Sequence, residues 1–310
     1  MVLPLVNLNL KTSGFRTAML LSLMAIVLSH EAYGAIIGDN NLREWYEEPS
    51  AKVREAGRAT AVLIKKSRNW LLEHEGQWGF SPEVPTFGDA DSICSGEIFR
   101  EQISPGDCSG FLVDKRHLVT AHHCIEPMGG CSDIQVVFDF FKASMTQVDY
   151  PLNPESVFQC RSVIHSNDIE DWAILELDRD VTGRVPLKLA VLPDARGAVG
   201  SPVAILGYPR GLPLKIAAGA NVREPSGLID PEMAQDYFEA DLDVFGGSSG
   251  APVIHGTTGE VEGILVTGFG EFEDPQTDTV TGKECWSLRK MPLEDASLPW
   301  ITKARSLPRF

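Results

Sequence analysis

Short runs of aliphatic and aromatic residues recur along most of this chain, and glycine, proline or charged turn residues separate one run from the next. Apolar runs with such boundaries are typical of β-strands, because the turn residues end each strand. The runs that predict strands are 59–64, 110–113, 118–121, 134–138, 162–164, 172–177, 203–206, 238–242, 251–254 and 261–266. Strands at this density favour a barrel or a sandwich, so the sequence predicts an all-β protein.

Other parts of the chain give different expectations. The polar, acidic segment 35–57 is expected to be an extended lead-in, and 68–74 to be either a short helix or a surface excursion. Residues 79–91, rich in glycine and proline, are expected to form a loop. Residues 298–304 are expected to close the chain as a short C-terminal helix. With 310 residues, 43% of them hydrophobic, the chain suits one large domain or two tightly packed halves.

The formal net charge of the chain is −16. Binding to nucleic acid depends on clustered Lys and Arg side chains that neutralise phosphates, and the sequence has no such cluster. We therefore expect no nucleic-acid partner. The charge alone does not indicate a substrate, since acidity mainly keeps a protein soluble.

The first 34 residues have the pattern of a signal peptide. Lys11 and Arg16 precede an apolar run at 18–28, which is shorter than the roughly 20 residues that cross a bilayer. We expect cleavage after Gly34 or Ala35, and an uncleaved membrane anchor is the alternative. Cleavage would give a secreted or periplasmic protein with no stable membrane insertion.

The chain has six cysteines, at positions 94, 108, 124, 131, 160 and 285. In an exported protein they can pair as disulfides, because the compartment is oxidising. No Cys-x-x-Cys pair is present, and only Cys124 has a histidine beside it, so we expect no structural zinc site. The sequence alone does not choose among the possible pairings.

Three segments carry the residue types that nucleophilic hydrolysis requires. They are Thr120-Ala-His-His-Cys124, Asp171-Trp-Ala-Ile-Leu175 and Gly247-Ser-Ser-Gly-Ala-Pro252. Serine is a poor nucleophile at neutral pH. It therefore needs an imidazole that takes its proton and a carboxylate that holds the imidazole in the right tautomer.

These segments resemble the His, Asp and Ser signatures of the trypsin/chymotrypsin superfamily of serine proteases, Thr-Ala-x-His-Cys, Asp-x-Ala-Leu and Gly-x-Ser-Gly-x-Pro. Their order along the chain also fits, and Cys108-Ser-Gly-Phe-Leu-Val113 precedes the histidine. The chain is most similar to the bacterial secreted trypsin-like and glutamyl-endopeptidase-like branch. The resemblance implies two packed six-stranded antiparallel β-barrels of the chymotrypsin type, at 58–180 and 181–310, with the active site between them.

The resemblance also implies a role for each residue in these motifs. His123 is the general base, Asp171 orients it, and Ser249 is the nucleophile. The backbone N–H groups of Gly247 and Ser249 form the oxyanion hole. The expected reaction is hydrolysis of a protein or peptide substrate through an acyl-enzyme, by a monomer that needs no metal or cofactor.

A disulfide between Cys108 and Cys124, pinning the histidine loop to the first barrel, is implied by the same resemblance. The pairing of the other four cysteines stays open at this point. We favour the pairs Cys131–Cys160 and Cys94–Cys285.

One departure from the superfamily concerns activation. Trypsin-like zymogens carry an aspartate just before the nucleophile, which pairs with a newly freed amino terminus, but here the residue is Ser248. The segment Ile36-Ile-Gly38 resembles a mature trypsin-like start, yet no Lys or Arg cleavage site precedes it. We therefore expect constitutive activity, with a short propeptide as the alternative.

A second departure concerns the substrate pocket, which the resemblance places at Asp243, Val266, Thr267 and Gly268. Asp243 stands where trypsin-like enzymes bind Arg or Lys, through a charge-assisted contact. Val266 stands where glutamyl endopeptidases have an acid-binding histidine, and Thr267 replaces a serine that supports the catalytic carboxylate. Basic, small apolar and acidic side chains are the expected preferences, in that order.

Two alternatives use the same fold. One is a catalytically silent protease homologue that acts as a binding protein, because fold does not prove function. The other is an esterase or a narrow processing protease that uses the same three residues.

Overall fold

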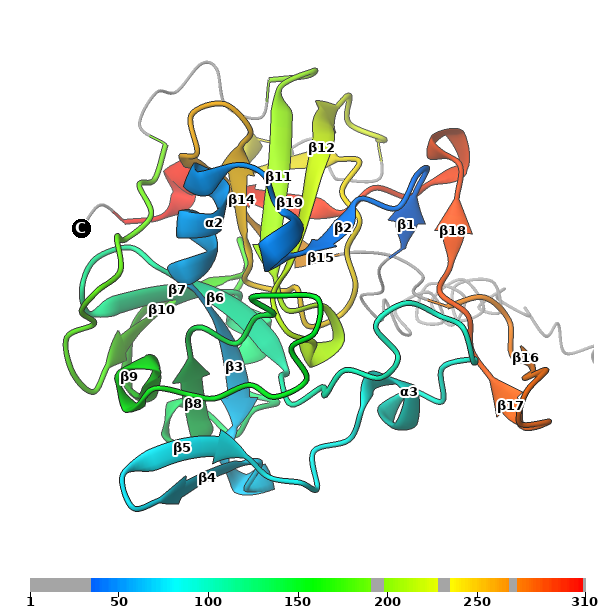
Figure 1. The fold of residues 1–310 in the computed structure, drawn as a ribbon. Helices are drawn as coiled ribbons and strands as arrows, with labels where there is room; N and C mark the ends of the chain where they lie inside the picture. Colours follow the sequence, from blue (N-terminus) through cyan, green and yellow to red (C-terminus); the bar gives the residue numbers. More distant parts are fainter. Residues whose placement is uncertain (1–34, 191–197, 228–234, 268–271, 309–310) are drawn as a thin grey trace, which may run out of the picture. The chain divides into compact units, whose positions relative to one another are not determined.

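The computed structural model describes residues 35–190, 198–227, 235–267 and 272–308. The predicted signal peptide at 1–34 lies outside these residues. In the part of the chain that is described, no helix is long and apolar enough to cross a membrane. The described chain is built mainly of antiparallel strands, as the sequence predicts (Figure 1).

The first barrel is closed and six-stranded, in the order β10-β7-β6-β3-β8-β9. All of its pairings are antiparallel, including the β9–β10 pair that closes it. The strands are β3 (Thr60–Lys65), β6 (Cys108–Leu112), β7 (His117–Thr120), β8 (Ile134–Val137), β9 (Val157–Asn167) and β10 (Trp172–Leu177).

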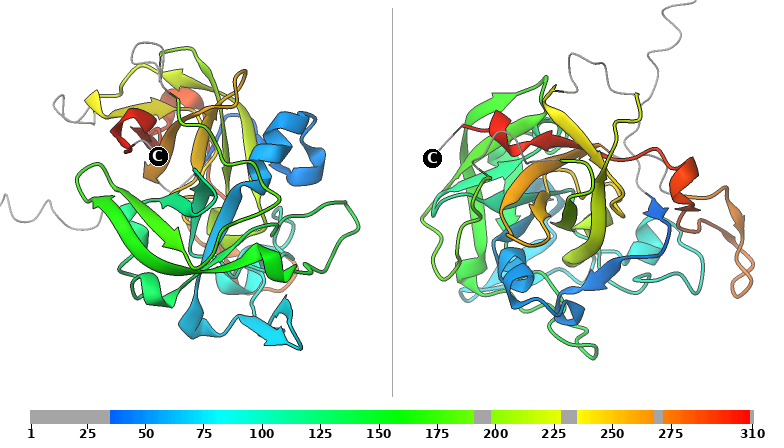
Figure 2. Two further views of the ribbon diagram at one scale, coloured as in Figure 1. Left: turned by 90° about the vertical axis from the view of Figure 1, so that its left-hand side faces the viewer. Right: turned by 90° about the horizontal axis from the view of Figure 1, so that it is seen from above.

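The second barrel also has six strands in a closed ring, β11-β14-β15-β19-β13-β12, because β11 also pairs with β12. The right-hand view of Figure 2 shows this ring. The strands are β11 (Pro202–Gly207), β12 (Lys215–Arg223), β13 (Tyr237–Ala240), β14 (Pro252–His255), β15 (Val261–Thr267) and β19 (Trp300–Lys303). The prediction of two six-stranded antiparallel barrels is confirmed. Strand β2 (Leu42–Glu44) pairs antiparallel with the start of β12, at Lys215–Ala217.

The prediction of a helix at 298–304 is wrong for most of that segment. Residues Trp300–Lys303 form strand β19, which lies between β13 and β15 and hydrogen-bonds to both. Ile301 and Thr302 are completely buried there. The second barrel needs this strand to close, and that pairing outweighs the helical pattern of the isolated segment. Only one turn of 3-10 helix, η9 (Ala304–Ser306), follows it.

The lead-in expected to be extended at 35–57 contains more structure. It includes β1 (Ile36–Ile37), β2, the 3-10 helix η1 (Trp45–Glu47) and the start of helix α2 (Ala51–Arg58). The side chain of Ser50 caps α2 by accepting a hydrogen bond from the N–H of Val53. Helix α2 buries Val53, Ala56 and Gly57.

The remaining elements are short. Residues 68–74, expected to be a helix or an excursion, contribute to a surface hairpin of β4 (Leu71–His74) and β5 (Gln77–Phe80). The others are α3 (Phe87–Ala90), β16 (Gln276–Thr277), β17 (Glu284–Cys285), β18 (Lys290–Met291), η2 (Lys66–Arg68), η3 (His122–Cys124), η4 (Cys131–Asp133), η5 (Pro154–Ser156), η6 (Pro209–Gly211) and η8 (Leu293–Asp295).

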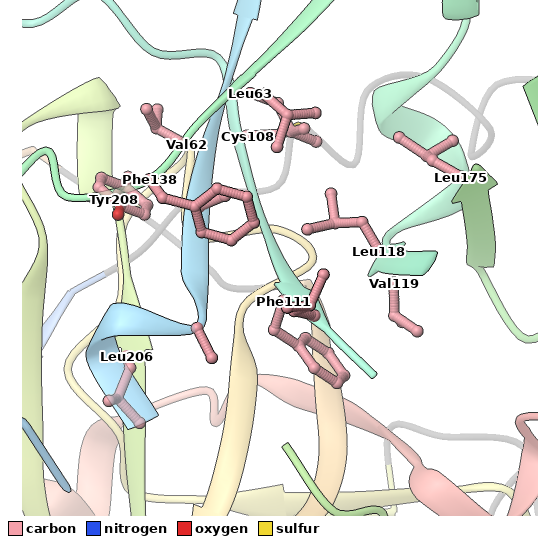
Figure 3. Close-up of a cluster of buried hydrophobic side chains, with 14 of the residues drawn as sticks. Val62, Leu63, Cys108, Phe111, Leu118, Val119, Phe138, Leu175, Leu206 and Tyr208 are labelled. Carbon is pink, nitrogen blue, oxygen red and sulfur yellow. The ribbon is translucent and has the colours of Figure 1, made fainter. Parts of the chain in front are cut away.

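One buried cluster joins the two barrels (Figure 3). Leu206 on β11 and Tyr208, directly after that strand, pack with first-barrel residues such as Val62. Tyr208 is fully buried, and its hydroxyl donates a 3.0 Å hydrogen bond to the carbonyl of Thr60. The ring of Tyr208 also stacks on Phe140. This shared core fixes one barrel against the other, which a site between them requires.

Three disulfides cross-link the chain. Cys108–Cys124, Cys131–Cys160 and Cys94–Cys285 are the pairs, and all three match the expected pairing. The first ties β6 to the turn that carries His123.

Candidate active site

His123 lies on η3, directly after β7, and two contacts with Asp171 fix its position. The N–H of His123 donates a 2.8 Å hydrogen bond to Oδ1 of Asp171. Nδ1 of the imidazole lies 2.6 Å from Oδ2 of the same carboxylate. Because an ionised carboxylate only accepts, Nδ1 is the protonated nitrogen in this contact. Nε2 is then left with a lone pair that can take a proton.

Asp171 lies at the turn between β9 and β10, in an unusual backbone conformation. Its φ is +55°, in the left-handed region that non-glycine residues rarely adopt. Neighbouring contacts hold the turn: the N–H of His122 donates to the carbonyl of Asp171, at 3.2 Å. The indole N–H of Trp172 donates to the side chain of Glu170. A strained residue of this kind persists only where its surroundings determine its conformation.

Ser249 lies on the loop between β13 and β14, close to the turn of His123. Its carbonyl accepts a 2.8 Å hydrogen bond from the N–H of Ser109. The next residue, Gly250, has a φ of +85°, and a Cβ there would lie 2.4 Å from Oγ1 of Thr120. Only glycine permits this approach, so Gly250 brings Ser249 beside the residues that lead into η3. Within the described residues, no hydrogen bond joins the Ser249 hydroxyl to His123.

The turn before Ser249 presents two unused backbone donors. Neither the N–H of Gly247 nor that of Ser249 donates a hydrogen bond to any described residue. Two carbonyls of the turn accept hydrogen bonds. That of Gly247 accepts from the Ser109 hydroxyl at 2.8 Å, and that of Gly246 accepts from the N–H of Arg210. Free amides beside a serine are the arrangement that an oxyanion hole needs.

A comparison of the sequence with protein-family models gives one match, to the trypsin-like peptidase domain, over residues 108–264. The chain belongs to the trypsin-like peptidase family. No curated protein sequence is significantly similar to it.

Among solved structures, the trypsin-like peptidase is similar to Rv3671c from M. tuberculosis in an inactive form, with 16% identity and a TM-score of 0.45. That match covers 83% of this chain and 86% of the other. It is also similar to the VesB protease of Vibrio cholerae, with 13% identity and a TM-score of 0.48. That match covers 85% of this chain and 64% of the other.

In this trypsin-like peptidase, Asp243 is engaged by the lead-in segment. It is 1% exposed; Oδ1 accepts from the N–H of Ile37 at 2.7 Å, and Oδ2 from the N–H of Asn41 at 2.6 Å. Burial raises the pKa of Asp243 to about 6, although the two N–H donors oppose this. The role of Asp243 in binding Arg or Lys stays a prediction. These contacts do not favour it, because both oxygens already have partners.

The other predicted pocket residues lie on β15 and just after it. Val266 is buried and Thr267 is half-buried at the end of the strand. Gly268 lies outside the described residues. The Thr267 hydroxyl donates no hydrogen bond to Asp171 among the described contacts. Ser248 is buried, and its N–H donates to the carbonyl of Phe245.

Support for the turn of Asp171 comes instead from residues that the sequence did not indicate. The hydroxyl of Thr302, on β19, donates a 2.6 Å hydrogen bond to the carbonyl of Glu170. The hydroxyl of Tyr237, on β13, donates to the carbonyl of Ile169. No motif marks either residue, because the contacts arise only when the second barrel packs against the first.

Two clusters in the described chain contain enough Cys, His and Asp atoms for a metal site. One is Cys108, His123 and Cys124, and the other is Cys94, Asp278 and Cys285. In both, the two sulfurs are joined as a disulfide. A disulfide sulfur is not the thiolate that binds a metal, so neither cluster offers a metal-binding set of ligands.

Proposed function

We propose that this peptidase is a serine endopeptidase in which Ser249, His123 and Asp171 form the catalytic triad. The observation that carries the proposal is the two-point contact between Asp171 and His123. It orients the imidazole and keeps the proton on Nδ1, which is the tautomer that a general base needs.

The reaction follows from these positions. Oγ of Ser249 attacks the carbonyl carbon of the scissile bond while Nε2 of His123 takes the hydroxyl proton. The N–H groups of Gly247 and Ser249 bind the resulting oxyanion, and each donor contributes about 3 kcal/mol to stabilising the transition state. His123 then gives the proton to the leaving amine. Water repeats the sequence on the acyl-enzyme and releases the second product.

The proposal includes export and activity without a freed amino terminus. Three disulfides support export, because such bonds persist in oxidising compartments. The hydroxyl of Ser248 carries no charge that could pair with an ammonium group. We therefore expect the enzyme to be active without the aspartate ion pair of trypsin-like zymogens.

A fluorophosphonate probe tests the nucleophile, because it labels only an activated serine. Wild-type protein should be labelled and Ser249→Ala should not. Ser248→Ala is the matched control, since it removes the neighbouring buried hydroxyl and should keep the label. A folded wild-type protein that takes no label would overturn the proposal and leave the silent binding homologue. Label that survives in Ser249→Ala would assign the nucleophile elsewhere.

A further inference from the structure

A cavity of about 310 Å³ lies beside the turn that carries the predicted oxyanion hole. Its lining includes Gly246 and Gly247 of that turn, together with Arg68, Trp70 and Asp107. We call it the turn-side pocket. None of the residues predicted to form the substrate pocket from sequence contributes to its lining.

The carboxylates of the turn-side pocket already have partners. Oδ1 of Asp107 lies 2.6 Å from Nη1 of Arg68, and Oδ2 accepts from the N–H of Lys65 at 3.1 Å. Asp91, which also lines the pocket, accepts from Nε and Nη2 of Arg210. A basic side chain entering the pocket would have to compete with these arginines for each carboxylate.

Two side chains of the pocket, those of Arg68 and Trp70, keep unused hydrogen-bond donors. Beyond its pair with Asp107, Arg68 makes no hydrogen bond to any described residue, and its side chain is 38% exposed. A guanidinium group has five N–H donors in a planar fork, so several remain for a ligand. The indole N–H of Trp70 likewise has no acceptor within the described chain. The guanidinium of Arg68 lies over the Trp70 ring, 4.6 Å from its centre, which holds the two donors together.

The position of the pocket indicates which part of a substrate reaches it. Asp107 leads directly into Cys108, whose disulfide holds the turn of His123. In the proposed mechanism His123 gives a proton to the leaving amine, so the residues after the scissile bond pass on this side of the site. A side chain from that part of the substrate would enter between Gly247 and Arg68.

We propose that the turn-side pocket selects substrates with a glutamate among the first residues after the scissile bond, whose carboxylate is bound by the N–H groups of Arg68 and Trp70. This inference rests on the proposed endopeptidase function and names its substrate class. A carboxylate fits because it accepts two charge-assisted hydrogen bonds from an arginine fork. The net charge of −16 repels an acidic peptide at long range, so the preference arises inside the pocket rather than during encounter.

The test uses the exported protein and sets of peptides that differ only by Glu, Gln or Lys at each position after the cleaved bond. At one position the wild-type ratio of kcat/KM for Glu over Gln should be about tenfold. Arg68→Gln should lower the ratio to near one, and Trp70→Phe should lower it in part. Because both peptides are cleaved by the same sample, the ratio does not depend on how much of a variant is folded.

Arg161→Gln is the matched control, since Arg161 is an exposed, ion-paired arginine on β9. Its ratio should stay at the wild-type value. A ratio that is unchanged in Arg68→Gln, or a wild-type preference for Gln or Lys at every position, would overturn the inference.

An ester substrate with no residue after the scissile bond separates this inference from the proposed function. Ester hydrolysis that depends on Ser249, together with no preference for Glu, would overturn the pocket and leave the function in place. A folded wild-type protein that cleaves neither esters nor peptides would overturn the function, and the inference with it.

Discussion

The hydroxyl of Tyr237 in the second barrel donates a 2.5 Å hydrogen bond to the carbonyl of Ile169, two residues before Asp171 in the first barrel. Tyr237 is 5% exposed, and burial raises its pKa to about 12, so the hydroxyl keeps its proton at any working pH. With the Thr302 contact to Glu170, this bond holds the turn in which Asp171 adopts its left-handed conformation.

Replacing this hydroxyl should reduce catalysis without weakening substrate binding. In Tyr237→Phe the turn of Asp171 loses a contact from the second barrel, and the imidazole of His123 is oriented less tightly. We expect kcat to fall about tenfold while KM stays within about twofold, since small displacements of a catalytic group lower the rate strongly. Steady-state kinetics with one peptide substrate measures both values.

Tyr46→Phe is the control for that experiment. The Tyr46 hydroxyl also makes a hydrogen bond, to Glu47, but on the surface of the lead-in. Its kcat should equal that of the wild type. Equal losses in both variants, or a higher KM with an unchanged kcat in Tyr237→Phe, would show that Tyr237 does not position Asp171.

The buried carboxylate of Asp243 should make stability depend on pH. Its pKa is raised from 3.8 to about 6 in the folded protein, so between these values the folded state holds the proton more tightly than the unfolded chain. The free energy of unfolding should therefore fall as pH rises from below 4 to above 6, by about 3 kcal/mol in total from this group. Asp243→Asn should lack this component.

Urea unfolding at pH 4.5 and 7 measures the effect as a difference between wild type and variant. Asp39→Asn, which changes an exposed aspartate of the same segment, is the control and should keep the wild-type dependence. The interpretation is wrong if Asp243→Asn and the wild type show the same change between the two pH values.

A methyl group at Gly250 should disrupt the contact between the two barrels at the site. The added Cβ would lie 2.2 Å from the carbonyl oxygen of Ser109, at a φ of +85°. We expect Gly250→Ala to lose roughly 3 kcal/mol of stability and its fluorophosphonate label, because Ser249 can no longer lie beside the turn of His123. Gly76→Ala separates strain from crowding, since Gly76 has a φ of +77° but no atom within 4 Å of its Cβ position.

Gly76→Ala should cost only about 1 kcal/mol, the price of the backbone conformation alone, and should keep the label. Thermal or denaturant unfolding of the two variants gives the comparison. Similar losses in both would mean that the close approach at Gly250 does not constrain the loop of Ser249.

Local sequence patterns predict most strands of the two barrels, because each apolar run has its own turn residues at its ends. The arrangement of these strands in two six-stranded barrels is implied only by the family resemblance. The local pattern does not predict strand β12, since Ala217, Ala218 and Gly219 at its centre have low β-propensity. The segment of strand β19 is compatible with a helix in the sequence, because seven residues do not fix a period. Its pairing with β13 and β15 decides the conformation, and that pairing is not visible in the segment itself.

The candidate site could likewise be predicted only in part. The motifs indicated His123 and Asp171, and the structure brings these two within hydrogen-bond distance. The contacts of Tyr237 and Asp243 join segments that are far apart in the sequence, so no motif or residue spacing predicts them. The motif position of Asp243 predicts a contact with a substrate cation, and it does not reveal that the N–H groups of Ile37 and Asn41 in the lead-in bind the same carboxylate.

The Cys94–Cys285 bridge offers a test of how the disulfides stabilise this fold. It joins residues 191 apart, whereas Cys131–Cys160 joins residues 29 apart. If a cross-link acts by limiting the unfolded chain, its contribution grows with the logarithm of the loop it closes. Replacing both cysteines of the longer pair with serine should then cost about 1 to 2 kcal/mol more than the same change in the shorter pair. Denaturant unfolding of the two double variants measures this difference, and a larger loss in the shorter pair would place the contribution in native-state contacts rather than in chain entropy.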